Sequence, residues 1–233
     1  MPPMSKRLLA LTFSISAVLA ACTADTPSSA PATPDAAPQA AAPAATDPVK
    51  ETVMPTLMSD DINQLVPAGM QLVDSVRGDL TGKGLDDALL VAALPTAPQA
   101  ELGQGSPRSV LLLRNDGNGQ LQVAARNDRL VPCERCGGIA GDPYAYSHIE
   151  GGHFTVSVSG GSRQRWASDY RFQYRAQDDS WQLASVIREV TDTVTGQNQR
   201  QQLDAAAVTG ALSFADFDPA SLPAAPALEE ELN

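Results

Sequence analysis

Apolar and polar residues alternate along several stretches of the chain, and this pattern constrains the fold most strongly. A period of two puts every second side chain on one face of a strand, so that one face is buried and the other meets water, as in antiparallel sheets. The alternation is clearest in residues 121–125, 154–159 and 170–175. Turn-forming residues separate the stretches at 115–119, 150–152 and 177–180. The sequence therefore predicts an all-β fold of antiparallel hairpins, arranged as a sandwich or like a propeller blade.

Two unbroken apolar runs, at 89–94 and 110–113, predict more central strands. A short helix is expected over 59–66, where Ser59 supplies a cap and Pro67 a stop. We expect the β domain to span residues 56–203, which is one domain by length and large enough to bury a core without a metal.

Residues 1–21 have the features of a signal peptide, because Lys6 and Arg7 precede an apolar run too short to cross a bilayer. The run ends Leu-Ala-Ala-Cys22, which resembles the lipobox of bacterial lipoproteins. The resemblance implies cleavage before Cys22, lipid on its thiol and acylation of the new N-terminus, and thus a membrane anchor. An ordinary secretory signal is the alternative. Thr23, in place of aspartate, favours the outer membrane of a Gram-negative bacterium, and we expect the periplasmic side.

Both ends of the mature chain have compositions that do not favour a fold. Residues 22–55 are rich in Ala, Pro, Thr and Ser and lack large apolar side chains to bury, so they predict an extended tether. Residues 204–233 are rich in Ala and Pro and end in acidic residues, which predicts a solvated, disordered tail. The net charge of −11 argues against nucleic acid as a partner, because phosphate binding requires many cations.

Cys133 and Cys136 are followed by His148 and His153, an order close to that of a four-ligand zinc site. The histidines of a zinc finger lie about one turn apart on a helix, whereas two glycines separate these and favour a hairpin. That hairpin pairs Glu150 with His153 and sets both histidines on the polar face of the sheet with Thr155 and Ser157. In an oxidising periplasm a disulfide between the cysteines is expected. Thiol redox chemistry and zinc binding are the alternatives.

The loop 78–87 and the strand that follows it resemble the calcium loops of FG-GAP or VCBS repeats, which build propeller blades. On that pattern Asp79 is the first ligand, Thr81 the second, Lys83 the third and Asp87 the last, with Gly84 at the turn. An ammonium group supplies no oxygen ligand and repels Ca²⁺. We therefore expect a degenerate, empty loop in which Lys83 pairs with Asp79 or Asp87 in place of the metal. No other cofactor is expected.

Three further segments accompany this loop: CxxCGG at 133–138, GDP at 141–143 and GGS–RW at 160–166. The combination resembles a group of bacterial lipoproteins, and the resemblance implies an envelope location without specifying an activity. More loosely, some lipid-anchored proteins with such loops look like periplasmic inhibitors or immunity proteins against peptidoglycan-cutting enzymes.

The sequence contains no G-x-S-x-G, H-E-x-x-H, P-loop or dinucleotide motif, and we expect no enzyme activity. A partner-binding surface is predicted where cations gather around an aromatic residue, because arginine and tryptophan often anchor interfaces. Its members are Arg163, Arg165, Trp166, Arg171 and Arg175. Ordinary pairing of these arginines with nearby acids is the alternative.

The leading hypothesis is a lipid-anchored binding protein without catalytic activity that faces the periplasm and inhibits, or gives immunity against, an envelope enzyme. A second hypothesis is an envelope-maintenance module that binds cell-wall glycan through Trp166 and Trp181. A third is an enzyme that uses Glu150, His148 and His153.

Overall fold

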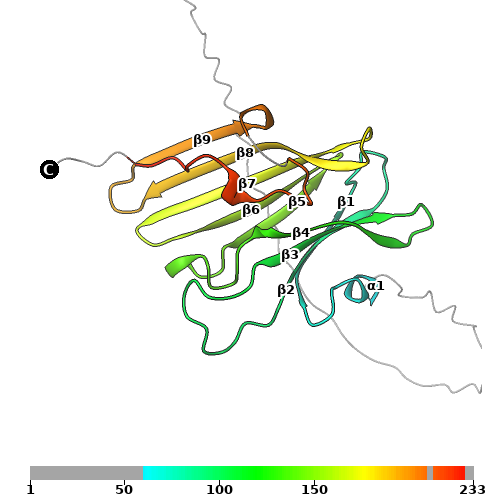
Figure 1. Ribbon diagram of the computed structural model, residues 1–233, viewed down its shortest axis with the longest axis horizontal. Coiled ribbons are helices and arrows are strands. Elements are labelled where there is room, and N and C mark those ends of the chain that lie inside the picture. Colours follow the sequence, from blue (N-terminus) through cyan, green and yellow to red (C-terminus); the bar gives the residue numbers. More distant parts are fainter. Residues whose placement is uncertain (1–59, 209–211, 229–233) are drawn as a thin grey trace, which may run out of the picture. The chain divides into compact units, whose positions relative to one another are not determined.

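The computed structural model describes residues 60–208 and 212–228. Within them lie a short helix and nine strands (Figure 1), which are α1 (Asp60–Gln64), β1 (Gln71–Gly78), β2 (Asp87–Ala93), β3 (Arg108–Asn115), β4 (Leu121–Val131), β5 (Tyr144–Glu150), β6 (His153–Gly161), β7 (Gln164–Arg175), β8 (Ser180–Asp192) and β9 (Asn198–Asp204). Three single-turn 3₁₀ helices also occur, namely η1 (Gly138–Ala140), η2 (Ala205–Ala207) and η3 (Pro219–Ser221). None of the helices in this part of the chain is long and apolar enough to cross a membrane.

The strands form two antiparallel sheets in chain order, β1-β2-β3-β4 and β5-β6-β7-β8-β9. Within each sheet every pair of consecutive strands is antiparallel, which confirms the prediction of an all-β fold of antiparallel hairpins. The two sheets share one core, as in a sandwich. Leu89 and Leu112 of the first sheet and Phe154, Phe172 and Val186 of the second are buried in the same cluster.

Helix α1 covers the other face of the first sheet. Ile62 and Leu65 pack there against Leu90 and Leu113. Strands β2 and β3 are thus buried on both faces, and for this reason they appear in the sequence as unbroken apolar runs. The helix lies within the predicted range, and Pro67 follows it.

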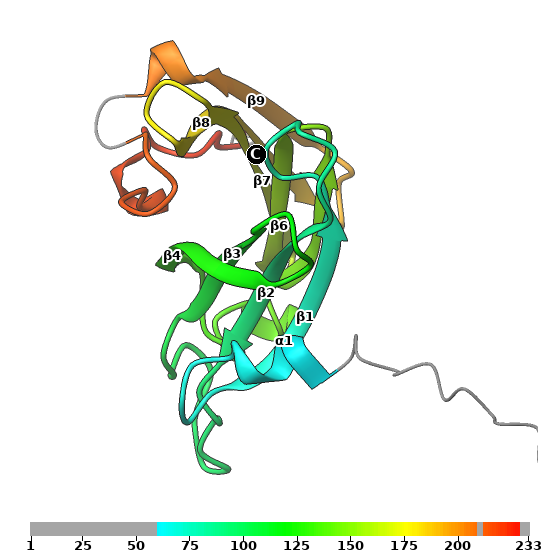
Figure 2. The same cartoon turned by 90° about the vertical axis from the view of Figure 1, so that its right-hand side faces the viewer.

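The chain after β9 belongs to the β domain, so the predicted tail at 204–233 is wrong for much of its length. Residues 212–214 pair with the start of β8 through Leu183 N–H to Leu212 O (2.7 Å) and Phe214 N–H to Trp181 O (2.8 Å). Phe214 and Phe217 are buried, and their rings meet Phe172 edge-on at 5.4 and 5.5 Å. Figure 2 shows this C-terminal segment (residues 212–223) on the concave side of the sheets. Two aromatic residues in an Ala/Pro-rich stretch bury enough apolar surface to hold it there.

Strand β4 also departs from its predicted alternation. Leu121, Val123 and Ala125 were expected on one face, but the β3–β4 register shifts between Leu112 and Leu113. The bulge reverses the faces, so Leu121 packs on the α1 side, Ala125 packs on the inter-sheet core and Val123 is exposed.

The β5–β6 hairpin has the predicted register. Glu150 pairs with His153 and His148 with Thr155, and Gly151 and Gly152 have φ of 48° and 79°. A two-residue turn with positive φ at both positions matches the twist of the strands and favours glycine. The signal peptide, Cys22 and the tether at 22–55 lie outside the described residues.

Candidate functional site

The loops of the β domain gather at two opposite ends, as Figure 1 shows. The disulfide end comprises 94–107, 132–143, 162–163 and 193–197. Its loops are joined by main-chain hydrogen bonds from Gly103 to Arg135 O (2.8 Å), from Gly161 to Gly137 O (2.8 Å) and from Thr193 to Arg163 O (3.0 Å). The aspartate end comprises 79–86, 116–120, 151–152 and 176–179.

At the aspartate end, Asp79 is surrounded by main-chain donors. Its carboxylate accepts hydrogen bonds from the N–H groups of Gly84 (2.6 Å), Lys83 (3.0 Å) and Thr81 (3.1 Å). Burial alone would raise the pKa of Asp79, but these donors outweigh it and hold the pKa below its ordinary value. The loop is therefore closed around the carboxylate by its own backbone.

Asp87 joins this loop to the neighbouring hairpin, because its two oxygens accept from Leu80 N–H (3.1 Å) and Asn115 N–H (2.9 Å). Burial raises its pKa, and the two N–H donors offset part of the rise. The predicted ion pair of Lys83 with Asp79 or Asp87 is not found among the ion pairs of the described residues. The Lys83 ammonium lies instead over the Tyr174 ring, 5.5 Å from its centroid.

The predicted calcium ligands are thus brought together in one loop, but their acceptor atoms are already engaged. Trp181 fixes the loop to the second sheet, since its indole N–H donates to Leu80 O at 2.8 Å. In residues 60–208 and 212–228, no group of three or more His, Cys, Asp and Glu side chains could hold a metal ion. An empty loop remains a prediction, and calcium titration tests it.

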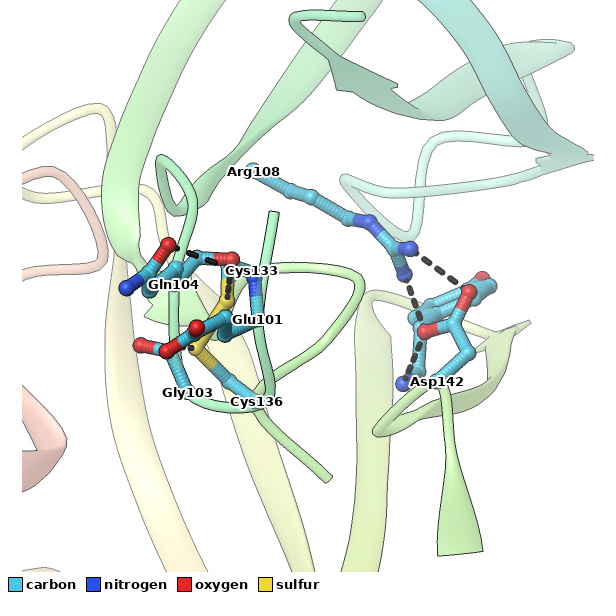
Figure 3. Close-up of a disulfide and its surroundings, with 8 residues drawn as sticks. Glu101, Gly103, Gln104, Arg108, Cys133, Cys136 and Asp142 are labelled. Atoms are coloured by element: carbon cyan, nitrogen blue, oxygen red, sulfur yellow. Dashed lines mark hydrogen bonds and ion pairs between the residues drawn. A yellow bond between two sulfur atoms is a disulfide. The ribbon is translucent and has the colours of Figure 1, made fainter. Parts of the chain in front are cut away.

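Cys133 and Cys136 form a disulfide, as predicted. The bond closes the loop that follows β4, and Figure 3 shows it against the β2–β3 loop. Cys133 Sγ contacts Gln104 O at 3.3 Å, and the Gly103 N–H bond to Arg135 O lies alongside. Thiolate ligation of zinc is excluded while this bond is intact.

Arg108 and Asp142 form a second connection at this end. The guanidinium donates to both carboxylate oxygens, at 2.7 and 2.6 Å, in the fork geometry that gives strong pairs (Figure 3). The side chain of Arg108 is only 2% exposed, whereas that of Asp142 is 43% exposed. The pair holds the GDP segment against the start of β3.

The three glycine-containing segments of the sequence meet at the disulfide end. A Cβ atom at Gly137 would lie 2.2 Å from Gly141 O, and one at Gly160 would lie 2.6 Å from Trp166 Cζ2 and 2.7 Å from Gly137 O. Side chains cannot fit at these distances. The CxxCGG, GDP and GGS–RW segments are therefore explained by close packing, without requiring a catalytic role.

Four of the large apolar side chains that are exposed in the described residues lie at the disulfide end. They are Leu94 (44% exposed), Leu102 (61%), Ile139 (76%) and Val194 (74%). The β2–β3 loop also encloses a hollow of about 360 Å³. The sequence predicted Leu94 at the end of a central strand, but β2 ends at Ala93 and leaves it exposed. Sequence analysis missed the other three residues, each of which is a single aliphatic residue in a turn-forming segment.

Charge at the disulfide end is largely paired. Besides the Arg108–Asp142 pair, Arg163 Nε donates to Asp192 Oδ2 at 2.8 Å. The other charged residues of these loops are Glu101, Glu134 and Arg135. In a chain with a net charge of −11, this end is therefore close to neutral and carries the exposed aliphatic residues.

The five residues of the predicted partner-binding surface do not form one surface. Trp166 packs against the inter-sheet core, and it shares one hollow with Arg165 but not with the other three arginines. Arg163 lies at the disulfide end, and Arg175 is the last residue of β7, at the opposite end of that strand, with its Nε 3.5 Å from Asp178 Oδ1. Alternation along β7 and the length of that strand separate residues that are close in sequence.

The residues of the two alternative hypotheses are also located. Trp181 is buried, whereas Trp166 is partly buried and lines a hollow of about 210 Å³. His148 and Glu150 are exposed on β5, and His153 Nδ1 lies 3.3 Å from Gly151 O.

No protein family, curated protein or solved structure matches this chain.

Proposed function

We propose that this chain is a lipid-anchored, non-catalytic binding protein of the Gram-negative envelope, and that its disulfide end contacts a protein partner in the periplasm. The observation that carries the proposal is the pair Ile139 and Val194. Both are about three-quarters exposed, at 76% and 74%, and they stand on loops joined through 161–163 by main-chain hydrogen bonds. Exposed aliphatic side chains on braced loops lose little conformational entropy on association.

The charge of this end supports a protein partner. Interface cores are depleted of charged residues and rich in apolar contact area. The pairing of Arg108 with Asp142 and of Arg163 with Asp192 removes most of the local charge, although the chain as a whole is acidic. An enzyme of the cell envelope is the partner class suggested by the resemblance to periplasmic inhibitors.

The location comes from the N-terminal sequence. Lipid at Cys22 and a tether at 22–55 would let the β domain reach partners away from the membrane surface. Labelling with radioactive palmitate tests the anchor. The wild-type chain should take up label and fractionate with membranes, and Cys22→Ser should do neither. Wild-type protein that stays unlabelled in the cytosol would contradict the location.

Site-specific crosslinking tests the contact surface. A photoreactive amino acid is placed at position 139 or 194 of the full-length protein in the envelope, with position 123 as the matched control, because Val123 is also exposed but lies on β4. We expect a discrete crosslinked protein from 139 and 194 and none from 123.

A substitution that disrupts the proposed interface checks whether the crosslink depends on binding. Ile139→Asp places a charge in the proposed interface and should abolish the crosslink from position 194. Crosslinks of equal yield from 123 and 139, or a crosslink from 194 that survives Ile139→Asp, would overturn the proposal.

A further inference from the structure

The outer face of the second sheet carries a groove that the proposed protein contact does not use. This face points away from the C-terminal segment (Figure 2), and the groove has a volume of about 340 Å³. That volume is at the small end of the range for ligand pockets. The groove crosses β5 to β9, so its walls are strand positions and not loops.

Four side chains form one row across the strands. His148 pairs with Thr155, Thr155 with Arg171, and Arg171 with Ser185, and all four line the groove. Arg171 is exposed and makes no ion pair with any residue in 60–208 or 212–228. Its guanidinium therefore offers donors to a ligand, and a carboxylate matches their geometry in a bidentate pair.

A second row lies beside the first and consists of Tyr146, Ser157, Asp169, Ile187 and Gln202, of which all but Ser157 line the groove. Asp169 and Gln202 supply oxygen acceptors for hydroxyl groups, and Gln202 also supplies donors. The Tyr146 side chain is half exposed at the end of the row and presents a flat apolar surface. Ile187 is the one aliphatic residue larger than alanine among those that line this groove.

We propose that this groove binds a small saccharide that carries a carboxylate. The carboxylate pairs with Arg171, the hydroxyls bond to Asp169, Gln202 and the hydroxyl side chains, and a sugar ring packs on Tyr146. A peptide would instead need apolar pockets for its side chains, whereas seven of the eight residues that line this groove have hydrogen-bonding atoms in their side chains. The site is separate from the disulfide end, so either proposal can fail without the other.

Ligand-observed NMR on the full-length protein in detergent tests the site. The probes are a disaccharide of galacturonic acid, the matching neutral galactose disaccharide, and a dipeptide with a free carboxylate. We expect the acidic disaccharide to bind roughly tenfold more tightly than the neutral one, since one charge-assisted pair is gained.

Three variants assign the contacts. Arg171→Gln should remove the preference for the acidic sugar and leave the neutral sugar unchanged, whereas Tyr146→Ala should weaken both sugars. Arg175→Gln is the control, because Arg175 lies on the same strand but outside the groove. Thermal midpoints of all variants should stay near that of the wild type, as expected for exposed positions. Equal binding of the two sugars, absence of sugar binding, or a dipeptide that binds more tightly than the acidic sugar would overturn the proposal.

Discussion

The side-chain amide of Asn127, in β4, donates a hydrogen bond to the main-chain oxygen of Phe217 at 2.8 Å. The same nitrogen donates to Phe214 O at 2.5 Å, and the amide oxygen accepts from the N–H groups of Arg129 (2.7 Å) and Leu130 (2.8 Å). Asn127 is buried, so water cannot replace these partners. One side chain thus connects the first sheet to the C-terminal segment.

Replacing Asn127 by leucine should destabilise the protein by about 3 kcal/mol, because several buried polar groups lose their partners together. Urea unfolding followed by tryptophan fluorescence measures the change. Gln122→Leu is the control, since Gln122 is exposed on the same strand and should cost less than about 0.5 kcal/mol. Equal effects of the two substitutions would show that the amide does not hold the segment.

Truncation tests where the β domain ends. A chain that stops at residue 203 lacks Phe214 and Phe217, whose burial covers Phe154, Phe172 and Tyr170. Loss of one buried phenylalanine costs about 3–5 kcal/mol, so loss of both should leave no cooperative unfolding transition. A chain that stops at residue 228 should unfold like the full-length protein in calorimetry. A cooperative transition in the shorter chain would restore the boundary at 203.

The Arg108–Asp142 pair should respond asymmetrically to mutation. Asp142→Ala leaves a buried guanidinium without a counter-charge and should cost about 3 kcal/mol. Arg108→Met leaves Asp142 half exposed to water and should cost clearly less. Chemical unfolding of both variants gives the comparison. A greater loss from Arg108→Met would mean that the packing of the arginine stem outweighs its charge.

The pH dependence of stability should include a contribution from Asp79. Its pKa is lower in the folded protein than its ordinary value of 3.8, so its stabilising effect is complete above that value and is lost as the pH falls through the lower folded pKa. Asp87 acts in the opposite sense, because burial raises its pKa and protonation in acid relieves the cost of its buried charge.

Asp79→Asn should therefore be less stable than the wild type at neutral pH, and this difference should shrink below pH 3.8. Urea unfolding over a pH series measures it. A difference that is the same at neutral and acid pH would mean that the three N–H donors do not favour the charged form.

Millimolar calcium should leave the thermal midpoint unchanged relative to the chelator EDTA. The oxygens of Asp79 and Asp87 already accept main-chain hydrogen bonds, and the ligand position at Lys83 carries a cation. A midpoint that rises with calcium concentration would show that the loop rearranges to bind the ion.

Much of the fold follows from local sequence. The alternation at 154–159 and 170–175, the glycine pair at 151–152 and the apolar runs of β2 and β3 predicted the strands, a hairpin register and the central position of two strands. Each of these features depends on residues that are close together in the chain. The sequence shows their alternation and their turn-forming residues directly. The disulfide was predictable because only two residues lie between its cysteines.

The candidate site was less predictable, because it depends on contacts between distant segments. Sequence grouped Trp166 with four arginines, but alternation put the tryptophan in the core and strand length separated Arg163 from Arg175. Composition suggested a tail after residue 203, and it could not reveal that Asn127 had hydrogen-bonding groups left for Phe214 and Phe217. The sequence by itself determined the strands and their hairpins, since those interactions are local. Only the tertiary structure decided which loops share an end and which late residues complete the core, because burial and hydrogen bonding between distant residues arise only when the sheets pack.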